Sequence, residues 1–154
     1  RVDEYAELMR RMHELGIAIN GTFVFGTDSD TVDCFDRTRD FVLEHRIGLP
    51  RFTVITPFPG TPLHARLEAA ERITTRDWSL YDGQHVVFEP ANMSAEQLRA
   101  GHERVWREVY SYRSILTRCR RAWRDRPLLW GANLGYRFYA RNLDRFYNCT
   151  GGLA

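Results

Sequence analysis

The stretch that decides the fold is IAINGTFVFGTDSDTVDCFDRTRDFVLEHRIGLPRFTVIT, residues 17–56. Residues 17–25 end in β-branched and aromatic side chains, which predicts a strand. A helix follows to about Arg46, with apolar residues on one face, and residues 52–56 predict a second strand. A strand, a helix and a strand joined by short loops form a βαβ unit, so we expect two parallel strands.

Two parallel strands are too few for a stable sheet, so we expect the missing strands to come from elsewhere. Residues 2–15 have helical spacing of apolar side chains, and this pattern is already under way at the first residue. The sequence therefore predicts a fragment of a longer protein.

The organisation changes near Ile73, from alternating strands and helices to a mainly helical region rich in Trp, Tyr and Arg. Thr61 followed by Pro62 predicts the start of a helix, and Ser94 with Gln97 predicts a capping box at the start of a long helix over 95–124. A last helix is expected over 128–148. We therefore predict an α/β part, residues 1–73, and a mostly α part, residues 74–154.

Composition excludes several classes of protein. The 154 residues are 44% hydrophobic and 27% charged, which is typical of a globular protein. The net charge of +2 is too small to imply nucleic acid by itself. Because every basic residue is Arg, a catalytic or phosphate-binding lysine is excluded within the chain. No apolar run is long enough for a membrane span and no signal peptide can be argued, so a cytoplasmic protein is expected.

Neither a metal site nor a catalytic nucleophile is predicted within the chain. Cys34, Cys119 and Cys149 are scattered and form no CxxC pair, so free thiols in a reducing compartment are expected. Of the histidines, His102 falls on the apolar stripe of the long helix and is expected to be a hydrogen-bonded residue at the edge of the core.

The loop after the first strand is a candidate ligand site. Gly26 lies at the strand's carboxyl end, where α/β proteins place ligands, and Asp28 and Asp30 can accept hydrogen bonds from ribose hydroxyls or an ammonium group. The alternative is that Asp30 or Ser29 only caps the next helix, and from spacing alone capping is the commoner role. The proline-rich turn over 56–62 either stiffens the chain or forms a wall against a flat ligand.

Three segments resemble the radical S-adenosylmethionine enzymes, in particular the cobalamin-binding branch that includes the hopanoid lipid methylases. Residues 17–31 resemble the fifth-strand segment of that barrel, although a Glu often stands in the family at the position of Asp30. The turn TPFPGTPL, residues 56–63, is similar to the turn after the sixth strand. Residues 78–94 resemble the start of the helical domain that follows the barrel in that branch.

This resemblance implies the last βαβ units of a partial (β/α) barrel, followed by a C-terminal helical domain. It implies an enzyme that methylates an unactivated carbon of a small-molecule or lipid-like substrate, using S-adenosylmethionine, a 4Fe–4S cluster and cobalamin. The cluster motif CxxxCxxC is absent here, so the cluster and cobalamin ligands are expected in the missing N-terminal part, and no catalytic residue is expected in the fragment. The residues implied in S-adenosylmethionine binding are Phe23, Val24 and Gly26 at the adenosine, Ile55, Thr56 and Phe58 at the adenine, and the acidic pair Asp28 and Asp30.

Two other functions remain open at this stage. One is a non-catalytic module whose Arg and aromatic side chains bind RNA or an acidic partner, although 20 acidic residues nearly balance the arginines. The other is a radical enzyme that does not transfer a methyl group.

The last helix is predicted to have two apolar faces. One is expected to pack against the long helix and comprises Leu128, Leu129, Ala132, Tyr136, Tyr139, Leu143, Phe146 and Tyr147. The other carries Trp130, Leu134 and Phe138 beside Arg137, Arg141 and Arg145. This second face is expected either to be covered by the rest of the protein or to make peripheral contact with a membrane.

Overall fold

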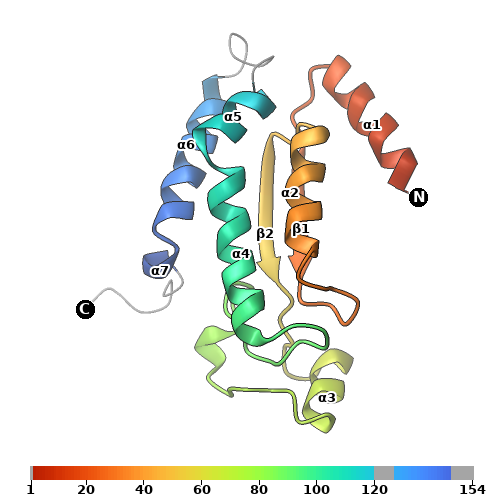
Figure 1. Ribbon diagram of the computed structural model, residues 1–154, viewed down its shortest axis with the longest axis vertical. Coiled ribbons are helices and arrows are strands. Elements are labelled where there is room, and N and C mark those ends of the chain that lie inside the picture. Colours follow the sequence, from red (N-terminus) through yellow and green to blue (C-terminus); the bar gives the residue numbers. More distant parts are fainter. Residues whose placement is uncertain (1, 120–126, 147–154) are drawn as a thin grey trace.

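The computed structural model describes residues 2–119 and 127–146 (Figure 1). Its elements are α1 (Val2–Glu14), β1 (Asn20–Phe25), α2 (Cys34–Glu44), β2 (Leu49–Val54), α3 (Pro62–Ala69), a 3₁₀ turn (Trp78–Leu80), α4 (Ala95–Val109), α5 (Tyr112–Cys119), α6 (Pro127–Arg141) and α7 (Leu143–Phe146). The fold is mixed α/β with helices dominant.

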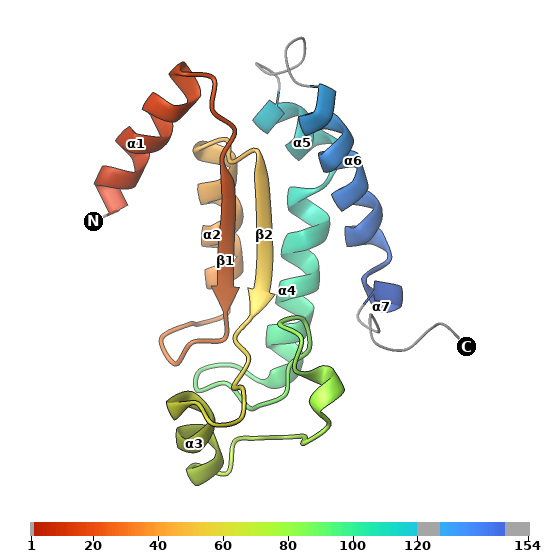
Figure 2. The same ribbon diagram turned by 180° about the vertical axis from the view of Figure 1, so that it is seen from behind.

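The predicted βαβ unit is confirmed. β1 and β2 are parallel, paired from Asn20 with Leu49 to Phe25 with Val54, and α2 connects them. Helices α2 and α4 cover one face of this sheet, whereas the view from behind shows the strands in front, with no helix over the other face (Figure 2).

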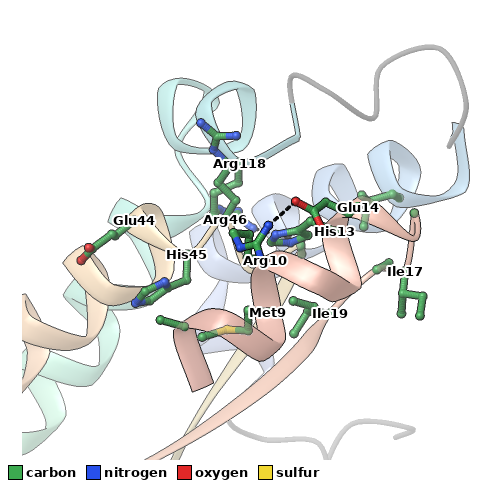
Figure 3. A pocket seen from close by; sticks show the side chains of 15 residues that line it. Met9, Arg10, His13, Glu14, Ile17, Ile19, Glu44, His45, Arg46 and Arg118 are labelled. Atoms are coloured by element: carbon green, nitrogen blue, oxygen red, sulfur yellow. Dashed lines mark hydrogen bonds and ion pairs between the residues drawn. The ribbon is translucent and has the colours of Figure 1, made fainter. Parts of the chain in front are cut away.

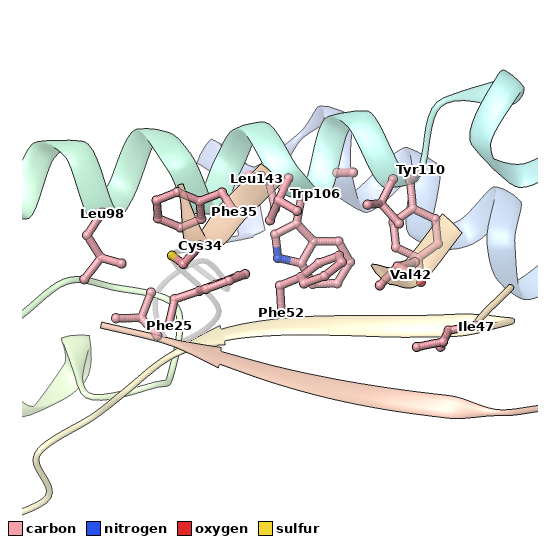
Figure 4. Packing of buried hydrophobic residues seen from close by; sticks show 14 of the residues in the cluster. Phe25, Cys34, Phe35, Val42, Ile47, Phe52, Leu98, Trp106, Tyr110 and Leu143 are labelled. Atoms are coloured by element: carbon pink, nitrogen blue, oxygen red, sulfur yellow. The ribbon is translucent and has the colours of Figure 1, made fainter. Parts of the chain in front are cut away.

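The core lies between the sheet and helices α2 and α4 (Figure 4). Phe25 contacts Phe35 with ring centroids 4.8 Å apart, and Phe52 meets the edge of Trp106 at 5.2 Å. Gly101 allows α4 to approach this closely, because a Cβ atom there would stand 2.2 Å from the Phe35 ring. The region after Ile73 thus supplies more than half of the buried residues of the core.

The two edges of the sheet differ. Along β2, the Tyr110 hydroxyl donates to the carbonyl of Pro50 at 2.6 Å, and the backbone N–H of Val54 donates to the carbonyl of Gly83 at 2.7 Å. His102 Nε2 lies 3.1 Å from the carbonyl oxygen of Phe52, between these two. The outer edge of β1 has no strand neighbour among the described residues.

Both predicted helix starts are confirmed. The Thr61 hydroxyl accepts the N–H of His64 at 3.2 Å, with Pro62 in the first helical position. Ser94 and Gln97 form the expected reciprocal capping box. Both motifs depend on neighbours within three residues, so the local sequence is sufficient to specify them.

The predicted ends of several elements are wrong. The first strand begins at Asn20 rather than residue 17, and the second spans Leu49–Val54 rather than 52–56. Proline is tolerated in β2 because Pro50 lies on the outer edge, where its missing N–H interrupts no ladder. Outside this sheet, an isolated antiparallel bridge joins Ile73 and Phe88.

The two long helices predicted after residue 94 are each interrupted. α4 ends at Val109 and α5 starts at Tyr112, while the last helix breaks at Asn142. On α6, Leu129 is buried and Tyr136 and Tyr139 pack on Trp106 as expected, and Leu143 is buried beyond the break. Leu128 is 85% exposed, so its assignment to the packed face is wrong. The Phe146 side chain, Tyr147, Cys149 and the ends predicted at 124 and 148 lie outside the described residues.

Candidate functional site

The two candidate loops lie side by side at the carboxyl ends of the strands. The N–H of Ile55 donates to the carbonyl of Phe25 at 2.8 Å, which brings residues 55–61 beside the loop that begins at Gly26. This is the edge at which parallel α/β sheets bind ligands.

Asp30 organises the first loop. Its Oδ2 accepts the N–H groups of Gly26 and Thr27, both at 2.9 Å. Helix α2 starts only at Cys34, with Asp33 as its N-cap residue, so the prediction that Asp30 or Ser29 caps this helix is wrong. The carboxylate of Asp30 therefore closes the turn at the strand end, and a ligand at this loop would meet a preformed backbone.

Asp28 is held by two arginines from the following segment. Its carboxylate oxygens lie 3.1 Å from Arg66 and 2.9 Å from Arg72, and its carbonyl accepts the side-chain amide of Asn92 at 2.7 Å. Side-chain contacts therefore tie the loop to α3 and to residues 89–92. A ligand hydroxyl at Asp28 would compete with these two guanidinium groups.

Gly26 has a positive φ of 95°, a conformation that favours glycine. A Cβ atom there would stand 2.9 Å from Leu98 and 3.1 Å from Phe88. The protein's own core therefore fills the space above this glycine. The contact between Gly26 and a cofactor stays a prediction that rests on the family resemblance.

The remaining predicted contacts divide between two sides of the sheet. Phe23 packs on Phe52 with centroids 5.8 Å apart, on the face covered by helices. Val24 points to the uncovered face and is 49% exposed. Ile55 and Thr56 are half-buried and Phe58 is exposed. The S-adenosylmethionine contacts of all these residues stay predictions, with Val24 and Phe58 the side chains most open to a ligand.

The uncovered face is mostly polar, and of its side chains the sequence motifs predicted a role only for Val24. Burial alternates along both strands, and the side chains directed away from the helices are Asn20, Thr22 and Val24 on β1 and Leu49, Arg51 and Thr53 on β2. Part of the signal was present in the sequence, because Phe23 and Phe52 each follow a polar residue, Thr22 and Arg51, in segments that alternate at period two.

A hollow of about 630 Å³ lies at the opposite, amino-terminal end of the strands (Figure 3). It is bordered by α1, residues 16–19 and the end of α2, and its lining includes Arg10 and Glu14, which form an ion pair with each other. Arg118 lies behind it and donates to the carbonyls of Ile47, Gly48 and Val109 and to the side chain of Asn133. Burial lowers the pKa of this guanidinium, and four oxygen acceptors compensate for the loss of water. None of the predicted site residues lines this hollow.

Burial shifts the pKa values of His102, Cys34 and Cys119 toward their neutral forms. His102 is hydrogen-bonded, as predicted, but it is fully buried rather than at the edge of the core, and burial lowers its pKa. Burial raises the pKa of the Cys34 thiol to about 12 and also raises the pKa of Cys119. Within residues 2–119 and 127–146, no three His, Cys, Asp or Glu side chains are grouped as metal ligands would be. The described cysteines therefore do not fit an iron–sulfur cluster, which binds thiolates.

Among the described helices, none is both long enough and apolar enough to cross a lipid bilayer.

Comparison with known proteins gives two kinds of match. A family described as "Domain of unknown function (DUF4070)" matches residues 61–128. The chain is 36% identical over 130 residues, 84% of its length, to the bacteriochlorophyllide d C-12(1)-methyltransferase of Chlorobaculum tepidum. It is 30% identical over 121 residues to the C-8(2)-methyltransferase of the same organism, covering 75% of the chain. The anaerobic magnesium-protoporphyrin IX monomethyl ester cyclase of Cereibacter sphaeroides is 24% identical over 114 residues, 74% of the chain and 18% of that protein.

The chain belongs to the radical S-adenosylmethionine family. The resemblance predicted from the three motifs is thereby confirmed. The chain spans about a quarter of the length of the two methyltransferases, 27% and 26%. All three names describe enzymes that act on tetrapyrroles, and two of them are methyltransferases.

Proposed function

We propose that this chain is the carboxyl-terminal part of a radical S-adenosylmethionine methyltransferase that acts on a tetrapyrrole. The observation that carries the proposal is the 36% identity to a bacteriochlorophyllide methyltransferase over 84% of the chain. The βαβ unit supplies the last strands of a partial (β/α) barrel, and helices α4 to α7 form the domain after it. The open edge of β1 supports this arrangement, because parallel sheets normally continue on such an edge.

In this proposal the strand ends bind S-adenosylmethionine. Val24 and Phe58 offer exposed apolar contacts, and Asp30 keeps the backbone turn after β1 closed. The 4Fe–4S cluster and cobalamin are assigned to the preceding part of the enzyme, since the described cysteines do not fit the cluster. When bound, these groups supply the radical and the methyl carrier. Residues of this chain position and shield the reactants.

The substrate class distinguishes two versions of the proposal. The motif resemblance favours a lipid-like substrate, as in hopanoid methylation, whereas the relatives named above act on tetrapyrroles. We favour the tetrapyrrole because those relatives match most of the chain. A cytoplasmic enzyme is proposed, with peripheral membrane contact through Leu134 and Phe138 in the lipid version, as both are exposed on α6.

Methyl transfer tests the proposal directly. The full-length enzyme, reconstituted anaerobically, is incubated with S-adenosylmethionine and either a chlorophyllide or a hopanoid lipid, and products are analysed by mass spectrometry. A chlorophyllide heavier by one methyl group supports the tetrapyrrole version. Methylation of the lipid alone contradicts the tetrapyrrole assignment, and a radical product without an added methyl group contradicts methyl transfer.

The S-adenosylmethionine site is tested by binding. Val24→Phe enlarges an exposed side chain beside the strand ends without disturbing the core, unlike Gly26→Val, which would collide with Leu98. We expect Val24→Phe to weaken S-adenosylmethionine binding by about 10-fold, or about 1.4 kcal/mol. The matched control is Leu116→Phe, which enlarges an exposed apolar side chain on α5, at the other end of the sheet. Equal affinity for both variants and the wild type would exclude Val24 from the site.

A further inference from the structure

The uncovered face of the sheet is unusually polar for a parallel sheet. Parallel strands are normally covered on both faces and read as nearly continuous apolar runs. Here Phe23, Phe25 and Phe52 occupy only the face under α2 and α4. The other face carries four polar side chains, Asn20, Thr22, Arg51 and Thr53, beside the apolar Val24 and Leu49. Polar side chains of this kind are costly to bury under an apolar layer, so this face is built to line a space that holds polar groups.

Arg51 is the only charged residue of the two strands, NGTFVF and LPRFTV. It is exposed and lies directly opposite Thr22 in the strand register, two residues before Thr53. Among the described residues no carboxylate forms an ion pair with Arg51, whereas Arg39, Arg72 and Arg104 each contact an acidic side chain. An arginine in the middle of a strand that has no counter-ion among the described side chains needs an explanation.

Protection of a sheet edge does not explain it. Charged residues on edge strands prevent pairing with other chains. The outer edge of β2, however, is already occupied by Tyr110, His102 and Gly83, and Arg51 projects from the face of the sheet. A guanidinium in this position is instead well placed to bind an anion, since its planar fork matches a carboxylate with two parallel hydrogen bonds.

We propose that Arg51, assisted by the Thr22 hydroxyl, binds the carboxylate of the tetrapyrrole substrate. This inference rests on the proposed function. Chlorophyllides and porphyrin monoesters share a flat, largely apolar ring that bears a free carboxylate. Arg51 meets the carboxylate, and the ring extends along the same face toward the strand ends, where the exposed Val24 is proposed to contact S-adenosylmethionine.

The geometry of the strand orients the substrate. From Arg51 to Thr56 the chain advances five residues, about 16 Å at the usual rise per residue of a strand. This length is of the order of the width of a tetrapyrrole with its substituents. An anchored carboxylate at Arg51 therefore directs the far side of the ring toward the strand ends, where S-adenosylmethionine is proposed to bind. Arg51 thus determines specificity and orientation.

The test compares a chlorophyllide with its methyl ester in the full-length enzyme. The wild type is expected to methylate the free acid with a KM about 10-fold lower than that of the ester. Arg51→Gln should raise the KM for the acid to that of the ester, while the KM for the ester, and S-adenosylmethionine binding, stay unchanged. Arg51→Lys should recover part of the preference because it keeps the charge and loses the fork. The matched control is Arg37→Gln, on the exposed side of α2.

Other outcomes separate this inference from the proposed function. If the wild type methylates acid and ester equally well, or if Arg51→Gln weakens both equally, the carboxylate contact is wrong and the proposed function stands. If neither compound is methylated, the proposed function fails. The affinity of the enzyme for the chlorophyllide, measured by titration, then tests whether Arg51 binds the carboxylate. Binding about 10-fold weaker in Arg51→Gln supports the contact, and equal binding or no binding to the wild type overturns it.

Discussion

The two faces of the β1–β2 sheet carry different residues for different tasks. On the covered face, aromatic rings of Phe23, Phe25 and Phe52 pack together and against α2 and α4. On the other face, most side chains are polar, and they include the single arginine of the strands. Because side chains alternate along a strand, one short βαβ unit both builds a core and presents a surface for a ligand. Substitutions should therefore affect stability on one face and binding on the other.

The largest expected effect is on the covered face. Phe52→Ala removes a fully buried ring that contacts Phe23, Phe25 and Trp106. We expect the free energy of unfolding to fall by about 3–5 kcal/mol, from lost burial and the cavity left behind. Urea unfolding followed by circular dichroism measures this loss.

Val24→Ala on the open face is the matched control and should cost less than about 1 kcal/mol, because Val24 is half exposed. If Phe52→Ala proves too unstable to purify, Phe52→Leu should show a smaller loss with the same direction. Equal losses on the two faces would contradict the division between core and surface.

The second effect tests how closely α4 approaches the covered face. Gly101→Ala would normally favour a helix, but the added Cβ would stand 2.2 Å from the Phe35 ring. We expect a net destabilisation of about 1–3 kcal/mol from overpacking. The matched control is Gly131→Ala on α6, where nothing lies within 4 Å of the added atom. That change should stabilise the protein by about 0.5–1 kcal/mol, as measured by thermal unfolding. Stabilisation by both substitutions would show that α4 lies farther from α2.

Sequence patterns predict the elements whose causes are local. The parallel pairing, the cap at Thr61 and the capping box at Ser94 depend on periodicity or on residues three positions apart. The break between α4 and α5 depends on distant contacts. Tyr110 reaches the carbonyl of Pro50, and Arg118 donates to the carbonyl of Val109, where α4 ends. No periodicity reveals such contacts, so the sequence predicts one long helix.

The candidate site shows the same distinction. The motif search located the strand-end loops, and the structure places them side by side. It did not anticipate that Asp30 accepts two N–H groups of its own loop, or that two arginines hold Asp28, because these contacts depend on how the chain folds back. The open face was readable from alternation along the strands, but two predicted strand boundaries were wrong, and Arg51 fell outside the predicted second strand.

A third prediction concerns the pH dependence of stability that the buried His102 causes. Burial lowers the pKa of His102 below its usual value of 6.5, and the nearby acidic groups Glu103 and Asp82 only partly oppose this. The unfolded chain therefore binds a proton more readily than the folded one. Stability is complete above about pH 6.5 and should fall as the pH drops below it, with a slope of up to about 1.4 kcal/mol per pH unit. Urea unfolding between pH 7 and pH 5 measures the slope. His102→Gln should flatten it, and an unchanged slope in that variant would assign the effect to other groups.

A smaller effect is expected at the outer edge of β2. Tyr110→Phe removes the hydroxyl that donates to the carbonyl of Pro50 at 2.6 Å and leaves the ring packed on Trp106. The expected loss is about 0.5–1.5 kcal/mol, the net value of one buried hydrogen bond. Tyr112→Phe, on an exposed ring two residues later, is the control and should change stability by less than about 0.5 kcal/mol. Equal effects would mean that the Tyr110 hydroxyl does not hold this edge.

The smallest effect on stability is expected on the uncovered face of the sheet, and the same variant distinguishes most directly between a role in folding and a role in binding. Thr22→Val keeps the shape and strand preference of the side chain and removes only an exposed hydroxyl opposite Arg51. The free energy of unfolding should therefore change by no more than about 0.5 kcal/mol.

If Thr22 and Arg51 share a carboxylate, the same substitution should raise the KM for a chlorophyllide by about 2- to 10-fold, the value of one hydrogen bond to the ligand, and leave the KM for its methyl ester unchanged. Thr117→Val, the same change at an exposed position on α5, serves as the control and should leave the KM for both compounds unchanged. If the variant keeps the free energy of unfolding and raises the KM for the chlorophyllide but not for its methyl ester, this face binds a ligand. A variant that lowers stability without changing the KM would show that the face is packed against protein.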